Sequence, residues 1–91
     1  MKNVTVFTTL VPTYGRDYKS ARMGILHKKA FGVYHWDTFD NETLFIAERT
    51  TLKAAQKFVQ NRYAGRIGPD GADQVDIVDR SGNVVEKVSV R

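Results

Sequence analysis

The chain has no cysteine, no long hydrophobic run and, in its first third, only one acidic residue. Without cysteine there is no disulfide framework, no thiolate zinc site and no cysteine nucleophile, and a reducing setting fits this composition. No stretch approaches the roughly 18 apolar residues of a membrane-spanning helix. The first residues, MKNVTVFTTLVP, alternate Thr and Val and are too polar for a signal peptide. We therefore expect a soluble, cytoplasmic protein without a membrane partner.

What the chain does contain is enough for one folded domain. Its 91 residues suit a single compact domain, residues 1–91, near the lower end of the usual size range. A domain of this size buries only roughly 60–65% of the surface that its unfolded chain exposes, so we expect a modest stability margin. Hydrophobic residues make up 42% of the chain and include five Phe, four Tyr and one Trp, which supplies one core and excludes a disordered chain.

Apolar residues follow the patterns of strands in three parts of the chain. The stretch NVTVFTTLV, residues 3–11, predicts a largely buried first strand. FGVYHWDT (31–38) and TLFIAER (43–49) flank the turn formers FDNE, which predicts a tight antiparallel hairpin. QVDIVD (74–79) and NVVEKVSV (83–90), separated by RSG, predict a second hairpin.

The clearest helix signal lies in TTLKAAQKFVQNRYAG, residues 50–65. Its apolar residues recur at helical spacing and gather on one face: Leu52, Ala55, Phe58, Val59 and Tyr63. Its polar residues fall on the other face: Lys53, Gln56, Lys57, Gln60 and Asn61. Thr50 or Thr51 can accept the first free amide protons, and Gly65 can end the helix in the left-handed conformation.

A second, short helix is predicted from about Ser20 to Ala30, where Met23, Leu26 and Ala30 recur on one face. Gly24 and two neighbouring lysines weaken this pattern, and the alternative is an extended segment that runs into the next strand. The predicted element order is β-(α)-β-β-α-β-β. We expect an α+β fold in which a small antiparallel sheet carries one or two helices packed on one face.

Strand parity divides the side chains of the first hairpin between the two faces of the sheet. Tyr34 and Trp36 are expected on one face, with Val33 and His35 on the other. We expect Tyr34 and Trp36, together with Phe45, to pack in the core beneath the helix. If they face away from the helix instead, that face of the sheet becomes a candidate interface for bases or for a protein partner.

Two resemblances add an expected fold and an expected source. From Phe31 to the end, the strand pair, the helix TTLKAAQKFVQ and the hairpin DIVDRSGNVVEK resemble a family of small bacterial strand-strand-helix-strand-strand domains of unknown function. Separately, PTYGRDYKS, residues 12–20, is similar to a stretch that follows the first strand in small uncharacterised proteins of phages and their bacterial hosts. These resemblances imply the fold and a phage or mobile-element source, and they bring no known activity or binding residue.

The formal charge of +4 is concentrated near the start of the chain. Residues 1–30 hold six basic residues against Asp17 alone, whereas residues 31–60 sum to −1 and residues 61–91 balance five basic with five acidic residues. We refer to residues 14–29 as the basic segment. Its candidate contact residues are Tyr14, Arg16, Tyr18, Lys19, Arg22, Lys28 and Lys29.

The basic segment has the side-chain chemistry of a nucleic-acid contact. Arginine forks match phosphate oxygens, lysines add point charges, and tyrosine rings offer faces on which bases stack. Arg16, Lys19 and Arg22 would share one face if this part of the segment were helical. Two alternatives stay open, a solvated surface without a partner and a basic patch that attracts an acidic protein.

Metal and cofactor chemistry are not predicted. His35 and Asp37, with His27 and Asp40, match no established zinc spacing, and we expect His35 to be partly buried in the sheet. The loop GPDGADQVD, residues 68–76, lacks the closing glutamate and the ligand order of a calcium loop, so we expect a plain turn. No Lys-Ser or Lys-Thr pair follows its glycines, as a phosphate-cradling loop requires.

Catalysis is not predicted either. Ser20 and His27 would share one face of a helix, but no third group or oxyanion donor can be placed beside them. A chain this short also has little room for a catalytic cleft. We therefore predict a small non-enzymatic domain that binds nucleic acid through the basic segment. The alternative is a protein-interaction or host-modulating adaptor of phage or mobile-element origin, including a homodimer formed through an exposed sheet edge.

Overall fold

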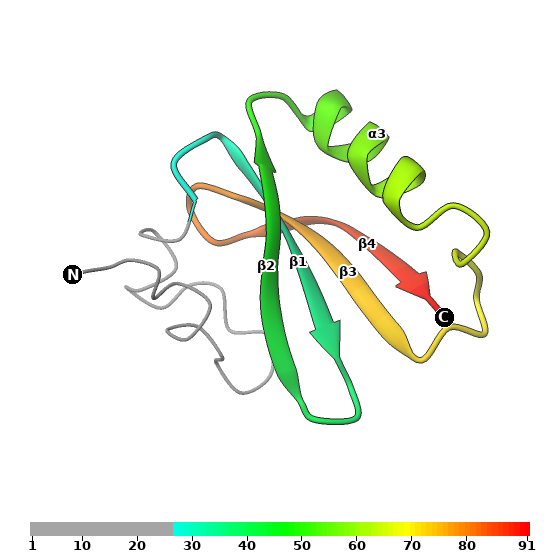
Figure 1. Ribbon diagram of the computed structural model, residues 1–91. Helices are drawn as coiled ribbons and strands as arrows, with labels where there is room; N and C mark the ends of the chain where they lie inside the picture. The colour runs from blue at the N-terminus through cyan, green and yellow to red at the C-terminus, as the bar shows by residue number, and fades with distance from the viewer. Residues whose placement is uncertain (1–26) are drawn as a thin grey trace.

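The structure is a computed structural model, and it describes residues 27–91 (Figure 1). These residues form four strands and one helix, in the order β1 (Phe31–Asp37), β2 (Glu42–Arg49), α3 (Leu52–Arg62), β3 (Asp73–Asp79) and β4 (Val84–Val90). The strands form one antiparallel sheet with the spatial order β2-β1-β3-β4, and α3 lies across one face of it. This small α+β fold confirms the two predicted hairpins and the helix between them.

The segment that precedes β1 differs from the prediction where the structure describes it. The strand predicted at residues 3–11 and residues 20–26 of the predicted short helix lie outside the described residues. Residues 27–30 are described and none of them is helical; residues 29 and 30 form a bend. The backbone amides of Lys28 and Lys29 both donate to the Glu48 carboxylate, at 2.7 and 3.1 Å, so they are not paired with helical carbonyls. The predicted helix therefore does not extend to Ala30.

α3 forms where a helix was predicted, because its capping residues and its apolar face both favour a helix over the same range. Thr51 has an extended backbone, and its hydroxyl oxygen accepts a hydrogen bond from the amide of Ala54 at 3.1 Å. Of the two threonines considered as the N-cap, Thr51 is therefore the one that serves. The helix ends at Tyr63, and Gly65 takes the left-handed conformation with a φ of 81°.

The core lies between α3 and the sheet. Ala55, Val59 and Tyr63 contribute the helix side of the core, and each is at most 2% exposed. The sheet side consists of four buried aliphatic residues: Val33, Val75, Ile77 and Val90. Phe58 packs against the edge of this core and remains only partly buried. Burial of one such aliphatic side chain contributes roughly 1.5–3 kcal/mol, so this cluster fixes α3 on the sheet.

β2 contains one extra residue where it pairs with β1. Val33 lies opposite Ala47, whereas Tyr34 lies opposite Phe45, so Ile46 is left between the two pairs as a β-bulge. The side chain of Ile46 packs against the core beneath α3. The bulge therefore lets β2 add a core residue, and it shifts the register of the pairing by one residue between the two parts of the hairpin.

The face of the sheet opposite α3 carries Tyr34. The hydroxyl oxygen of Tyr34 lies 2.7 Å from Nδ1 of His27, and its ring centroid is 5.5 Å from that of Phe45. The predicted parity of β1 is confirmed, but the expectation that Tyr34 packs beneath the helix is wrong. Parity decides which residues share a face and leaves open which face the helix covers. Tyr34 is also wholly buried, so its ring offers no surface on which a base can stack.

Candidate functional site

Two of the predicted nucleic-acid-contact residues, Lys28 and Lys29, are among the residues that the structure describes, and the other five lie outside them. The side chains of Lys28 and Lys29 are exposed. Their backbone is bound to the sheet, because both amides donate to Glu48 and the Arg80 guanidinium donates to the carbonyl of Lys28. Although partial burial opposes it, hydrogen bonding to these amides lowers the pKa of Glu48. This end of the basic segment is therefore held in place with two ammonium groups in solvent.

A second basic region begins where β2 ends. Residues 49–69 contain five basic residues and no acidic one. The five are Arg49, Lys53, Lys57, Arg62 and Arg66. Most of this run is α3, so its charges are carried on a regular scaffold that fixes their spacing.

Part of this region surrounds an open hollow beside α3. The hollow has a volume of about 570 Å³ and is lined by Arg49, Ala54, Lys57, Phe58, Asn61 and Arg62. The helical lining residues recur at intervals of three and four, which places them on one face of α3 next to the end of β2. Three cations and no carboxylate line this space. We refer to these six residues as the basic hollow.

Arg49 is positioned by two contacts at the wall of the basic hollow. Its Cζ atom lies 4.7 Å from the ring centroid of Phe58, and its Nη1 donates to the carbonyl of Glu48 at 2.6 Å. A guanidinium group has five N–H donors, so these contacts leave most of them available. Among the described residues, Arg49, Lys57 and Arg62 form no ion pair with a carboxylate. The hollow therefore presents uncompensated positive charge, which suits an anionic ligand.

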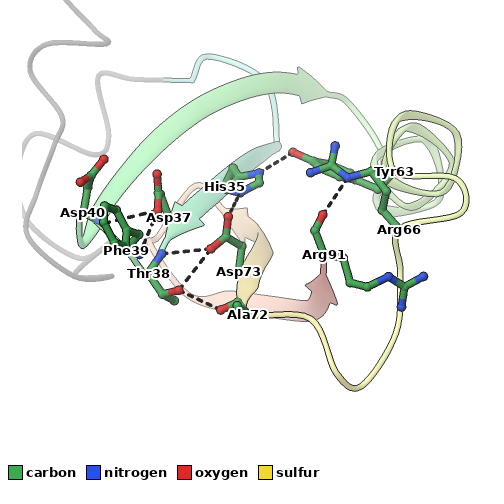
Figure 2. Close-up of polar contacts among 10 residues, drawn as sticks. All are labelled: His35, Asp37, Thr38, Phe39, Asp40, Tyr63, Arg66, Ala72, Asp73 and Arg91. Atoms are coloured by element: carbon green, nitrogen blue, oxygen red, sulfur yellow. Dashed lines mark hydrogen bonds and ion pairs between the residues drawn. The ribbon is translucent and has the colours of Figure 1, made fainter.

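Cations also surround Tyr63 at the end of α3. The Cζ atoms of Arg66 and Arg62 lie 5.2 and 5.9 Å from its ring centroid. Nε of Arg66 also donates to the carbonyl of Arg91 at 2.8 Å, as Figure 2 shows. The positive surface thus continues from the basic hollow past the end of the helix.

A hydrogen-bonded chain of three side chains lies between β1, β3 and the end of α3 (Figure 2). Nδ1 of His35 is 2.9 Å from the hydroxyl oxygen of Tyr63, and Nε2 of His35 is 2.9 Å from Oδ2 of Asp73. The hydrogen bond from His35, opposed by partial burial and aided by Thr38, lowers the pKa of Asp73. His35 is partly buried in the sheet, as predicted. Tyr63 is only 2% exposed, so its hydroxyl group is not presented to a substrate. The two hydrogen bonds instead join β1 to β3 and to the end of α3.

The acidic residues of the predicted loop do not converge. Asp70 pairs with Arg91 at 2.9 Å, Asp73 is bound to His35, and Asp76 is buried within β3. Among residues 27–91 no group of three or more His, Cys, Asp or Glu side chains is arranged to hold a metal ion. The same described range contains no helix that is long and apolar enough to cross a membrane.

The basic hollow was missed by the sequence reasoning for a specific reason. Charge was summed over thirds of the chain, and the middle third joins the acidic first hairpin to the basic helix. The sum of −1 for residues 31–60 therefore hides the acid-free run that begins at Arg49. A scan for runs without acidic residues would have found residues 49–69.

Comparison of the chain with protein-family models, with curated proteins and with solved structures finds no match. The two resemblances noted in the sequence, and the phage or mobile-element source that they imply, stay predictions. The candidate function therefore rests on the surface of this chain alone.

Proposed function

We propose that the protein is a non-enzymatic domain that binds nucleic acid through phosphate contacts. Its binding surface consists of the basic hollow together with the basic segment, residues 14–29. The observation that carries the proposal is the lining of the hollow, where Arg49, Lys57 and Arg62 meet without a carboxylate. Phosphate contacts of this kind supply affinity with little sequence selectivity.

The two parts of the proposed surface are joined at one end of the sheet. Glu48 binds the backbone of Lys28 and Lys29, and the next residue along β2 is Arg49, at the wall of the basic hollow. Consecutive side chains of a strand point to opposite faces of the sheet, so the lysines held by Glu48 and the hollow beside Arg49 lie on either side of this edge. A nucleic acid that contacts both parts of the surface therefore has to pass around the end of β2.

The first experiment is fluorescence anisotropy of labelled single- and double-stranded DNA and RNA with the wild-type protein. Measurements at about 50 and about 200 mM salt give the salt dependence of the association constant. Lys57→Ala is expected to weaken binding several-fold and to reduce the log–log salt slope by about 0.9 on duplex DNA, or about 0.7 on single strands. Lys57→Ala with Arg62→Ala should weaken binding further.

Lys87→Ala is the matched control, because Lys87 is an exposed cation on β4, away from the basic hollow. It removes the same charge and should leave affinity nearly unchanged. If Lys57→Ala and Lys87→Ala lose the same affinity for the nucleic acid, the loss is explained by net charge alone. That result would contradict a localised site. Absence of binding at low salt would overturn the proposed function.

Protein interaction is a second candidate function, and one observation favours it. Phe39, at the turn between β1 and β2, is 93% exposed. An aromatic side chain held in solvent is the kind of residue that anchors protein interfaces.

A further inference from the structure

The turn between β1 and β2 presents an aromatic ring with acidic neighbours. Residues 37–42 read DTFDNE, with Phe39 at the centre and Asp37, Asp40 and Glu42 around it. Residues 30–48 contain four acidic residues and neither Lys nor Arg, so no cation of the hairpin itself compensates these charges. We refer to residues 37–42 as the acidic tip.

The acidic tip is held in one conformation by hydrogen bonds within the turn. Oδ1 of Asp37 accepts from the amides of Phe39 and Asp40 at 2.9 and 3.4 Å. Nε1 of Trp36 donates to Oδ1 of Asn41 at 3.0 Å, and Asn41 takes the left-handed conformation with a φ of 55°. Figure 2 shows Phe39 beside Asp37 and Asp40 at the turn, and Phe39 is almost fully exposed.

The acidic tip is also fastened to the neighbouring loop. The Thr38 hydroxyl donates to the carbonyl of Ala72 at 3.0 Å, and the Thr38 amide donates to Oδ1 of Asp73 at 3.2 Å (Figure 2). Because the turn is already ordered, docking of Phe39 would cost little backbone entropy. A fitting partner offers an apolar surface for the ring with cations around it.

The chain itself carries such a surface. The basic hollow combines the ring of Phe58 and the methyl group of Ala54 with three cations. Its volume of about 570 Å³ lies within the range of sites that enclose small ligands. We propose that the acidic tip of one copy docks in the basic hollow of a second copy, with Phe39 in the hollow and the acidic side chains among Arg49, Lys57 and Arg62.

The contact is between molecules, because the two surfaces lie at opposite ends of β2 (Figure 1). The acidic tip leads into Glu42 and the basic hollow begins at Arg49, seven residues later, a length of about 23 Å in a strand. A tip-to-hollow contact uses a different surface on each copy, so it propagates head to tail. A single hairpin tip buries less than the roughly 1,200 Å² of stable interfaces, so association is weak and depends on concentration.

Sedimentation velocity over a range of protein concentrations tests the proposal. The average mass of the wild type should rise with concentration, and Phe39→Ala should remain monomeric. Val85→Ala is the control, because Val85 is an exposed aliphatic residue on β4, away from the acidic tip. It should associate like the wild type. A monomeric wild type, or association that survives Phe39→Ala, overturns the proposal.

Charge reversal gives a second test that a folding defect cannot imitate. One variant carries Asp40→Lys with Glu42→Lys, and the other carries Lys57→Glu with Arg62→Glu. Each variant alone should be monomeric, because its tip and its hollow then have like charge. An equimolar mixture should associate again, since each tip meets a hollow of opposite charge. A mixture that stays monomeric, while both variants are folded by circular dichroism, overturns the proposal.

The docking contact does not rest on the proposed nucleic-acid binding. The two share the basic hollow and therefore compete for it. Loss of self-association in Phe39→Ala with retained nucleic-acid binding supports both proposals. Absence of nucleic-acid binding, with self-association intact, contradicts only the proposed function.

Discussion

At the residue scale, the two histidines sit in different hydrogen-bonding environments. His35 has a partner on each ring nitrogen, Tyr63 and Asp73, and so joins three elements. His27 contacts Tyr34 through Nδ1, while its buried Nε2 has no partner among the described residues. Burial, and then the nearby charge of Arg80, lower the pKa of His27 below 6.5. The packing that buries His27 therefore favours its neutral form.

Removal of the Asp73 carboxylate should destabilise the fold in a pH-dependent way. Asp73→Asn weakens the hydrogen bonds to His35 and Thr38, and we expect the free energy of unfolding at pH 7 to fall by about 1–2 kcal/mol. The pKa of Asp73 is lowered from 3.8 in the folded protein. Its stabilising contribution is therefore complete above the unfolded pKa and is lost as the pH falls through the folded pKa.

Urea unfolding between about pH 5 and pH 2 measures this contribution. The difference between the wild type and Asp73→Asn should shrink as the solution becomes more acidic. Asp40→Asn is the control, since Asp40 is exposed at the turn, and it should change stability by less than about 0.5 kcal/mol. A difference that widens on acidification would contradict the assigned direction of the Asp73 pKa.

The ring of His27 leaves no room for a side chain at position 32, so a substitution of Gly32 should destabilise the fold. A Cβ atom built on Gly32 would lie 2.5 Å from Nδ1 of His27 and 2.8 Å from Cε1 of Tyr34. We expect Gly32→Ala to cost about 1–3 kcal/mol, as overpacking of a buried site does. In a His27→Ala background the cost should be smaller, because the nearest overlapping atoms are gone. The loss of unfolding free energy is measured by urea unfolding in both backgrounds. Equal losses would show that the new methyl group overlaps with atoms other than those of His27.

At the element scale, what could be predicted depended on regular periodicity. α3 was found because Leu52, Ala55, Val59 and Tyr63 keep helical spacing and because Thr51 and Gly65 flank them. These signals are local, so no knowledge of the rest of the fold was needed. The same holds for the two hairpins, whose turn-forming residues separate alternating runs.

What could not be predicted depended on relations between elements. The bulge at Ile46 breaks the alternation of β2, and only the pairing with β1 reveals it. Tyr34 points away from α3 because the helix covers the other face of the sheet. Strand parity predicts which residues share a face, but it does not predict which face the helix covers. The basic hollow likewise forms only when Arg49, at the end of β2, is brought beside Lys57 and Arg62.

The start of α3 should depend on one threonine and not on its neighbour. Thr51→Ala removes the oxygen that accepts from the amide of Ala54, and we expect it to lower the free energy of unfolding by about 1 kcal/mol. Thr50→Ala is the matched control, because Thr50 lies outside the helix and is exposed. It should change stability by less than about 0.5 kcal/mol. Equal effects, measured by chemical unfolding, would contradict the assignment of Thr51 as the cap.

At the scale of the whole molecule, the described charges are separated along β2. The turn between β1 and β2 lies at the lower end of β2 in Figure 1, and α3 follows its upper end. The basic hollow is lined by residues of α3 and by Arg49, at that upper end. The formal charge of +4 does not reveal this separation, because it sums both ends. A molecule with separated charges attracts polyanions and copies of itself at the same surface.

The two proposed interactions should therefore be separable by mutation and linked by competition. Phe39→Ala should leave the affinity for an oligonucleotide unchanged within about two-fold, well below the ten-fold change that corresponds to 1.4 kcal/mol. Lys57→Glu with Arg62→Glu should abolish both interactions. A short single-stranded oligonucleotide, added to concentrated wild-type protein, should lower the average mass seen by sedimentation towards that of a 1:1 complex. Formation of larger assemblies on its addition would contradict competition.

The irregular pairing of the two outer strands of the described sheet has a consequence for aggregation. β2 carries the extra residue Ile46, and β4 carries the extra residue Val85, because Ile77 pairs with Glu86 and Val78 with Val84. Bulges bend an edge and interrupt its row of evenly spaced amides and carbonyls. A strand from another molecule would therefore pair less regularly with β2 or β4 than with an uninterrupted strand. The two inserted residues thus make both described edges poorer templates for amyloid-like stacking.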